Sequence, residues 1–145
     1  MRIFLILMVV GFAAVALAQQ PDNTFVSAAD VDAMVAKAKT DRKPDQANFI
    51  QPLLRLAPYR ANLEYRIEGV DTPATIHEKE AELIYVIDGA GTFTTGGKLS
   101  GTGVEGGTSR RISKGDYIFV PENTPHSFTK TEGRLVIMSI HVPRG

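Results

Sequence analysis

The pattern of apolar and polar residues predicts one helix near the start of the chain. Between residues 27 and 39, apolar side chains recur at helical spacing and share one face: Val31, Met34, Val35 and Ala38. Ser27 can cap this helix, with Asp30 three residues later as its partner in a capping box. We therefore expect a helix with one apolar face over residues 27–39.

From Asn48 onward the pattern changes to short runs rich in Ile, Leu, Val, Tyr and Phe, separated by Gly, Pro and Asn. The expected strands cover residues 48–56, 61–67, 74–79, 82–87, 91–96, 109–113, 117–120, 126–130 and 134–142. Many short strands with turn signals between them favour an antiparallel sandwich or barrel over a parallel sheet with crossover helices. The expected fold class is therefore all-β with a short N-terminal helix.

The segment 96–107 has six glycines in twelve residues and no large aromatic side chain. This composition is typical of a mobile loop. Its glycines are accompanied neither by the lysine pattern of a phosphate-binding loop nor by a strand-to-helix context, so nucleotide binding is not expected here.

The first residues of the chain have the pattern of a secretory signal peptide. A basic residue, Arg2, is followed by an apolar run that ends in small residues at Ala18. The run is short of the roughly 20 apolar residues that span a bilayer, so an uncleaved membrane anchor is the less favoured alternative. We expect a signal peptide over 1–18, a helical extension over 19–47 and a β-barrel over 48–145, exported to the periplasm or secreted.

Composition excludes some partners and ligands. The 145 residues carry 16 basic and 16 acidic side chains and no long basic block, which argues against nucleic acid as a partner. After signal cleavage, no stable membrane insertion is expected. The chain has no cysteine, so it forms no disulfide, and any metal must be bound by nitrogen and oxygen.

Two motifs of fixed spacing contain residues suited to binding a metal. They read Gly69-x5-Thr75-x-His77-x4-Glu82-x6-Gly89 and Gly115-x5-Pro121-x-Asn123-x2-His126-x3-Lys130. In this order they resemble the two motifs of the cupin superfamily, G-x5-H-x-H-x3,4-E-x6-G and G-x5-P-x-G-x2-H-x3-N. The resemblance implies a double-stranded β-helix, also called a jelly-roll barrel, with a metal site inside that takes ligands from both motifs.

The residue types agree with that site. Thr75 and His77 are two apart and share one face of a strand, so both can point into a barrel. Glu82 begins the next expected strand and can turn its carboxylate toward the same cavity, while His126 follows a turn. We predict a divalent metal ion at His77, Glu82 and His126. Two imidazoles and one carboxylate with open positions suit Fe(II) and catalytic zinc, and Mn(II) is also compatible.

The chain departs from the family motifs at three positions. Thr75 stands where the family has its first histidine, and it removes one ligand, so a weak or absent metal site is an open alternative. Asn123 replaces a glycine, and asparagine tolerates a positive φ in a turn. Lys130 replaces an asparagine at a position remote from the ligands in the motif.

Several polar residues have more than one interpretation. His141, in the last expected strand, is a further candidate ligand that could supply the missing imidazole; a structural or surface histidine is the alternative. A rival spacing makes Glu78 the carboxylate ligand. Glu78 and Tyr65 are also candidate catalytic acid–base residues, provided that they face the cavity. Glu80 is expected to be a solvent-facing turn residue.

The arginines and tyrosines of two expected strands could make polar contacts at the mouth of the cavity, but cross-strand packing explains them equally well: Tyr59, Arg60, Tyr65 and Arg66.

The sequence leads to two functional hypotheses. The first is an exported, metal-binding cupin that acts on a small organic molecule, as a metal-dependent oxygenase, isomerase or lyase. The second is a non-catalytic cupin that binds a small ligand, for example a sugar, with a weak or absent metal site. A homodimer is compatible with both.

Overall fold

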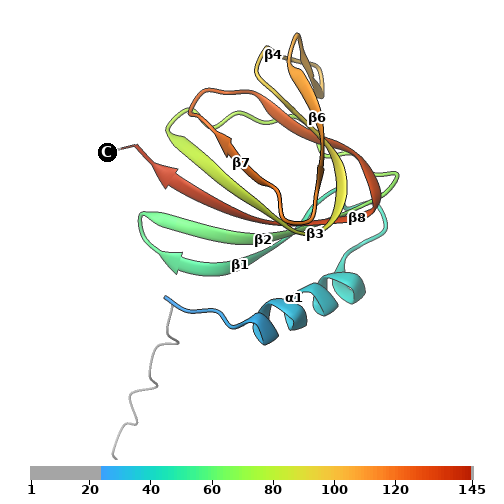
Figure 1. The fold of residues 1–145 in the computed structure, drawn as a ribbon, viewed down its shortest axis with the longest axis vertical. Coiled ribbons are helices and arrows are strands. Elements are labelled where there is room, and N and C mark those ends of the chain that lie inside the picture. The colour runs from blue at the N-terminus through green and yellow to red at the C-terminus, as the bar shows by residue number, and fades with distance from the viewer. Residues whose placement is uncertain (1–23, 145) are drawn as a thin grey trace, which may run out of the picture.

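The computed structural model describes residues 24–144. In chain order its elements are α1 (Ala28–Asp41), β1 (Phe49–Leu56), β2 (Tyr59–Ile67), β3 (Glu80–Thr95), β4 (Lys98–Ser100), β5 (Gly103–Glu105), β6 (Thr108–Ser113), β7 (Tyr117–Val120) and β8 (His126–Pro143). The larger sheet has the order β1-β2-β8-β3-β6, with β7 also paired to β3, and every pairing is antiparallel (Figure 1). The all-β fold with one short helix is confirmed.

Two long strands fold the sheet around its own interior (Figure 1). Strand β3 joins the expected strands 82–87 and 91–96, and β8 joins 126–130 and 134–142, because the two remain paired along most of their length. Gly89 and Gly91, which suggested a turn between the two expected strands, lie instead at bulges within β3. At Gly89, φ is +79°, and a Cβ atom would lie 1.9 Å from the carbonyl oxygen of Arg134. Only glycine permits this close approach.

Two other expected elements differ in the structure. Residues 74–79 do not form a strand; Thr75 makes a single bridge with His126, and the segment is otherwise irregular. The glycine-rich segment 96–107, expected to be a loop, contains the hairpin of β4 and β5, in which the Lys98 and Glu105 side chains lie 3.5 Å apart. Its glycines serve the turns of this hairpin, with positive φ at Gly97 and Gly101.

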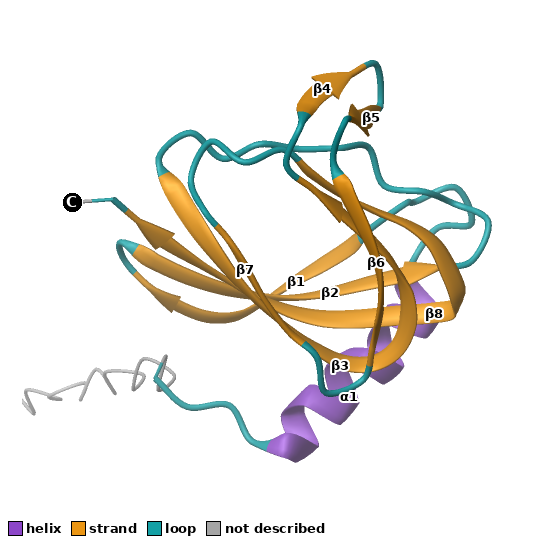
Figure 2. Cartoon of the chain, turned by 45° about the horizontal axis from the view of Figure 1, so that its top comes forward, coloured by secondary structure: helices purple, strands orange, loops and turns teal. Residues whose placement is uncertain are grey.

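The helix begins as the sequence predicted. Ser27 accepts a hydrogen bond from the backbone N–H of Asp30, and Asp30 accepts one from the backbone N–H of Ser27. Its apolar face packs on the outer face of the sheet (Figure 2), in a cluster that contains Val31, Met34, Val35, Ala38, Phe49, Leu53, Leu63, Tyr65, Ile67, Ile87 and Val136. The segment before the barrel therefore covers the outside of β1 and β2.

Successive residues of strand β2 point alternately to the outer and inner faces of the sheet. Its odd-numbered residues, such as Leu63 and Tyr65, pack under α1, whereas Asn62, Glu64 and Arg66 line the interior. Part of that interior is apolar, and its buried residues are Ile84, Val86, Phe93, Ile112, Val120, Phe128, Leu135 and Ile137. The rest is an open cavity lined mostly by polar residues.

The expected signal peptide, residues 1–18, lies outside the described residues. Within residues 24–144, no helix has the length and apolar character needed to cross a membrane. Export therefore stays a prediction.

Candidate metal centre

The cavity inside the barrel has a volume of about 380 Å³, within the range of small-ligand sites. The three histidines and Glu82 line it, and Thr75 lies beside them. Cross-strand pairing explains how strands distant in sequence converge here. His141 on β8 is the register partner of both Glu82 on β3 and Arg60 on β2, so the three side chains form one row on the inner face.

Backbone hydrogen bonds place the other two histidines. Thr75 and His126 exchange two N–H···O=C bonds of 2.9 Å, which fix the start of β8 beside the segment that carries His77. The carbonyl of His77 accepts a bond of 2.9 Å from the N–H of Asn123. Asn123 has a φ of +54°, as the turn before His126 was expected to need. Thr75 lines the cavity as the motif predicts, and its backbone contributes by holding His126.

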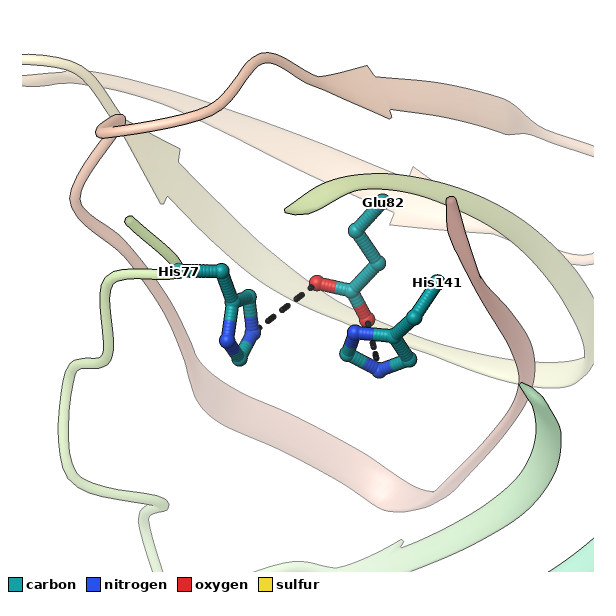
Figure 3. A group of neighbouring side chains, drawn as sticks. All are labelled: His77, Glu82 and His141. Atoms are coloured by element: carbon teal, nitrogen blue, oxygen red, sulfur yellow. Dashed lines mark ion pairs between the residues drawn. The ribbon is translucent and has the colours of Figure 1, made fainter. Parts of the chain in front are cut away.

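The Glu82 carboxylate lies at the centre of three imidazoles. Its Oε2 atom is 3.1 Å from His126 Nε2 and 3.6 Å from His77 Nε2, and its Oε1 atom is 3.8 Å from His141 Nε2. In Figure 3, the rings of His77 and His141 lie on either side of the carboxylate. One ligand atom from each of His77, Glu82 and His141 lies within 4.8 Å of the others, so these three form a group that could hold a metal ion. His126 contacts the same carboxylate.

The spacing of these donors can be compared with that of a metal site. A metal with bonds of about 2.0–2.2 Å holds adjacent ligand atoms roughly 3.0–3.5 Å apart. The separations around Glu82 run from 3.1 to 3.8 Å, so small shifts of the side chains would bring them around an ion. Glu82 is 4% exposed, and among the described residues its Oε2 atom has no hydrogen-bond partner despite the nearby imidazoles. A buried carboxylate oxygen without a hydrogen bond is costly, and a bound cation would satisfy it.

The pKa of His77 and the hydrogen bond of His126 also suit a metal. Burial lowers the pKa of His77 below its usual value; the Glu82 carboxylate opposes this shift, and His141 and His126 add to it. His126 Nδ1 lies 3.1 Å from the carbonyl oxygen of Thr124, and an N–H donated there leaves the Nε2 lone pair facing Glu82. Neutral imidazoles with free lone pairs are the form in which histidine binds metals.

His141 has a charged pair behind its ring. Its Nδ1 atom lies 3.2 Å from Glu80 Oε2 and 3.2 Å from Arg60 Nη2, and Arg60 donates to Glu80 at 2.6 Å. A proton on Nδ1 directed at the Glu80 carboxylate leaves Nε2 free to bind a metal. Glu80 is therefore not the solvent-facing turn residue that we expected, because it begins β3 and pairs with two side chains.

The remaining candidates are placed differently. Glu78 is exposed and does not line the cavity, so the structure brings Glu82 and not Glu78 to the histidines. Tyr65 is 6% exposed and packs beneath α1, on the face of β2 opposite the cavity. Neither faces the cavity, which was the condition for either of them to act as a catalytic acid or base.

Sequence reasoning missed Glu64 and Asn48, which line the same cavity as Arg66. A signal was available, because Asn62, Glu64 and Arg66 alternate with Leu63 and Tyr65 in β2. Polar residues at every second position between apolar ones indicate a polar face, and in a strand covered on its other face by a helix that face is the interior.

An antiparallel sheet folded around a His–Glu group defines a β-barrel protein with a candidate metal site of nitrogen and oxygen donors. The family profile described as the cupin domain matches residues 63–141, more than half of the chain. The chain therefore belongs to the cupin family, and a double-stranded β-helix is its fold. No curated protein matches the chain.

Solved structures with the same fold share less than a fifth of their residues with this chain. A protein from Bacillus halodurans has 18% identity and a TM-score of 0.60, covering 89% of this chain and 86% of its own. A putative mannose-6-phosphate isomerase from Ralstonia eutropha has 19% identity and a TM-score of 0.55, covering 72% and 89%. Fe(II)-HppE with an alternative substrate has 19% identity and a TM-score of 0.57, covering 70% and 52%. At these identities the likeness shows the fold alone.

Proposed function

We propose that this cupin holds a single divalent metal ion inside its barrel and uses it to act on a small organic molecule. The observation that carries the proposal is the buried Glu82 carboxylate, which has three imidazoles around it and one oxygen without a hydrogen bond to any residue of 24–144. The cavity of about 380 Å³ beside it has room for a small substrate.

Each residue of the centre has a distinct task in this proposal. His77, Glu82, His126 and His141 bind the metal, and His141 supplies the imidazole that Thr75 removes from the family motif. Glu80 accepts from the His141 ring from behind and so orients it, and Arg60 holds Glu80 in place. When bound, the metal would polarise a substrate oxygen or activate water or dioxygen. The donor set suits Fe(II), Mn(II) or Zn(II), and the similar structure HppE carries Fe(II).

A non-catalytic binding module is the second candidate function. Thr75 favours it, because a side chain that is a poor ligand stands where the family has a histidine. In that case the barrel would bind a small ligand, and the metal would be structural or absent.

Metal content tests the metal proposal. We expect protein purified without chelator to contain about one divalent metal ion per chain by elemental analysis. Removal of the metal with EDTA should lower the thermal unfolding midpoint, since a ligand that binds only the folded state stabilises it. Metal well below one per chain after dialysis against each of Fe(II), Mn(II) and Zn(II) would contradict the metal proposal and leave the binding module.

Export and homodimerisation are further proposals. Residues 1–18 support export through their signal-peptide pattern. Exposed apolar side chains on three paired strands support self-association, and they are Leu83, Tyr117, Phe119 and Val142. Mass spectrometry and light scattering on the protein from its own cells test both. A chain that still begins at Met1 would contradict signal cleavage, and the mass of one chain would contradict the dimer.

A further inference from the structure

A second polar group in the cavity is centred on Glu64, away from the metal ligands. Glu64 is 6% exposed, and both of its carboxylate oxygens accept hydrogen bonds. Oε1 accepts one from Ser139 Oγ at 2.7 Å, and Oε2 accepts one from Asn48 Nδ2 at 2.6 Å and one from Arg66 Nη2 at 2.7 Å. This carboxylate is satisfied by the protein itself, unlike that of Glu82.

The Arg66 side chain is held in one orientation. It is 3% exposed, its Nε–H donates to Thr72 Oγ1 at 3.1 Å, and its guanidinium carbon lies 4.3 Å from the centre of the Phe128 ring. With Nη2 bonded to Glu64, one nitrogen remains. Among the described residues, Arg66 Nη1 has no hydrogen-bond partner, although it is buried and the side chain lines the cavity.

Asn48 presents the complementary unpaired atom. Its Nδ2 atom donates to the same Glu64 oxygen that Arg66 contacts, and its buried Oδ1 atom has no hydrogen-bond partner within residues 24–144. An unpaired donor and an unpaired acceptor therefore flank one carboxylate oxygen. Buried polar groups of this kind are rarely left unsatisfied, so a partner from outside the described residues is expected at both atoms.

The charges around these atoms select a neutral group. Burial alone would raise the pKa of Glu64, but the charge of Arg66 and the hydrogen bonds from Ser139, Asn48 and Arg66 hold it below its usual range. Glu64 and Arg66 therefore cancel each other's charge. A hydroxyl group can accept from Arg66 Nη1 and donate to Asn48 Oδ1. A carboxylate could do only the first, and it would lie beside the negative charge of Glu64.

This group lies one step along the strand from the metal ligands. Ser139, which donates to Glu64, and His141 are successive inward-facing residues of β8 and are therefore roughly 7 Å apart. A molecule of a few carbon atoms can span that distance inside the cavity. We propose that Arg66 Nη1 and Asn48 Oδ1 form a hydroxyl-binding subsite, and that the substrate is a small hydroxylated molecule, such as a sugar acid, with another oxygen for the metal. Only the part of this inference in which a substrate oxygen binds the metal rests on the proposed function.

Two probes of equal chain length test the subsite. D-Gluconate has a carboxylate suited to the metal and several hydroxyl groups, whereas hexanoate has the same carboxylate and none. By titration calorimetry on metal-loaded protein, we expect gluconate to bind at least about 10-fold more tightly than hexanoate, as hydrogen bonds to a charged donor predict. Arg66→Lys keeps the charge that pairs with Glu64 but removes Nη1, and it should reduce this preference to near unity.

Arg111→Lys is the matched control, because Arg111 forms an Arg–Glu pair with Glu132 on the surface, and it should keep the preference. Asn48→Ala is a second variant that leaves the Arg66–Glu64 pair in place; it should also reduce the preference. Absence of gluconate binding at millimolar concentration, equal binding of both probes, or an unchanged preference in both Arg66→Lys and Asn48→Ala would overturn the inference.

The same samples separate the subsite from the metal. Metal content is measured in each, and it should be unchanged in Arg66→Lys and Asn48→Ala. If the protein bound no metal but still preferred gluconate, with the preference lost in these variants, the metal proposal would fail and the hydroxyl subsite would stand.

Discussion

Glu82→Gln is expected to lose its metal almost completely while the barrel remains folded. Glutamine has nearly the same shape as glutamate but lacks the charge that a divalent cation requires. Changes to residues behind the ligands typically lower metal affinity about 10–100-fold, so loss of the central carboxylate should lower it by more than about 100-fold. Elemental analysis after dialysis against a fixed metal concentration measures the effect, and turnover of any substrate should fall with it.

Urea unfolding of the metal-free protein shows whether Glu82 acts as a metal ligand or stabilises the fold. Because Glu82 Oε2 has no hydrogen bond among the described residues, its charge makes little contribution to the stability of the empty barrel. We expect metal-free Glu82→Gln to unfold at the same or a slightly higher urea concentration than the metal-free wild type.

Glu78→Gln is the control for Glu82→Gln. Glu78 lies four residues before Glu82 but is exposed outside the cavity, so this variant should keep its metal. Full metal occupancy in Glu82→Gln, or loss of metal in Glu78→Gln, would contradict the ligand set.

The fold was predictable because it depends on features that are local in sequence. Alternating apolar runs, the Ser27–Asp30 capping box and the two spaced motifs each occupy a short window. The prediction was wrong where a strand continues past residues that usually form turns. Gly89 resembles a turn residue, yet the pairing of β3 with β8 extends past it, and the glycine accommodates the backbone of Arg134.

The site was predictable only in part, for a related reason. The motifs contain His77, Glu82 and His126. In the structure His77 and Glu82 form a possible metal-binding group with His141, and His126 contacts the same carboxylate. The place of His141 depends on the register that opposes it to Glu82, a pairing between residues far apart in the chain. Tyr65 was a candidate and Glu64 was not. The alternation in β2 separates their two faces, but only the packing of α1 on the Tyr65 face shows that the Glu64 face is the interior.

One departure from the motif also has a structural consequence that the sequence did not show. Lys130, which stands where the family has asparagine, adopts a φ of +47°. Asparagine tolerates this conformation better than lysine does. Its backbone N–H donates to Asp71 at 3.0 Å, which holds the strained residue in place.

Glu64→Gln is expected to have the opposite profile to Glu82→Gln: a large loss of stability with the metal ligands intact. Removing the negative charge leaves Arg66 as a buried cation without its partner, and breaking a buried pair in this way typically costs about 3–5 kcal/mol. Urea unfolding of metal-free protein should show the loss, and the double variant Glu64→Gln, Arg66→Met should recover most of it, since no unpaired charge remains. A loss below about 1 kcal/mol would show that the pair does not stabilise the fold.

The pH dependence gives an independent check on the same pair. The pKa of Glu64 is lower in the folded protein than in the unfolded chain, so its contribution to stability is present above the unfolded pKa of about 4.3 and is lost as the pH falls through the lower folded value. The stability difference between wild type and Glu64→Gln should therefore be constant near neutral pH and shrink below about pH 4. A difference that stayed constant down to pH 2 would mean that the charge of Glu64 is not its cause. If the difference shrinks as expected, the two buried glutamates of the cavity have different roles: Glu64 stabilises the fold, and Glu82 binds the metal.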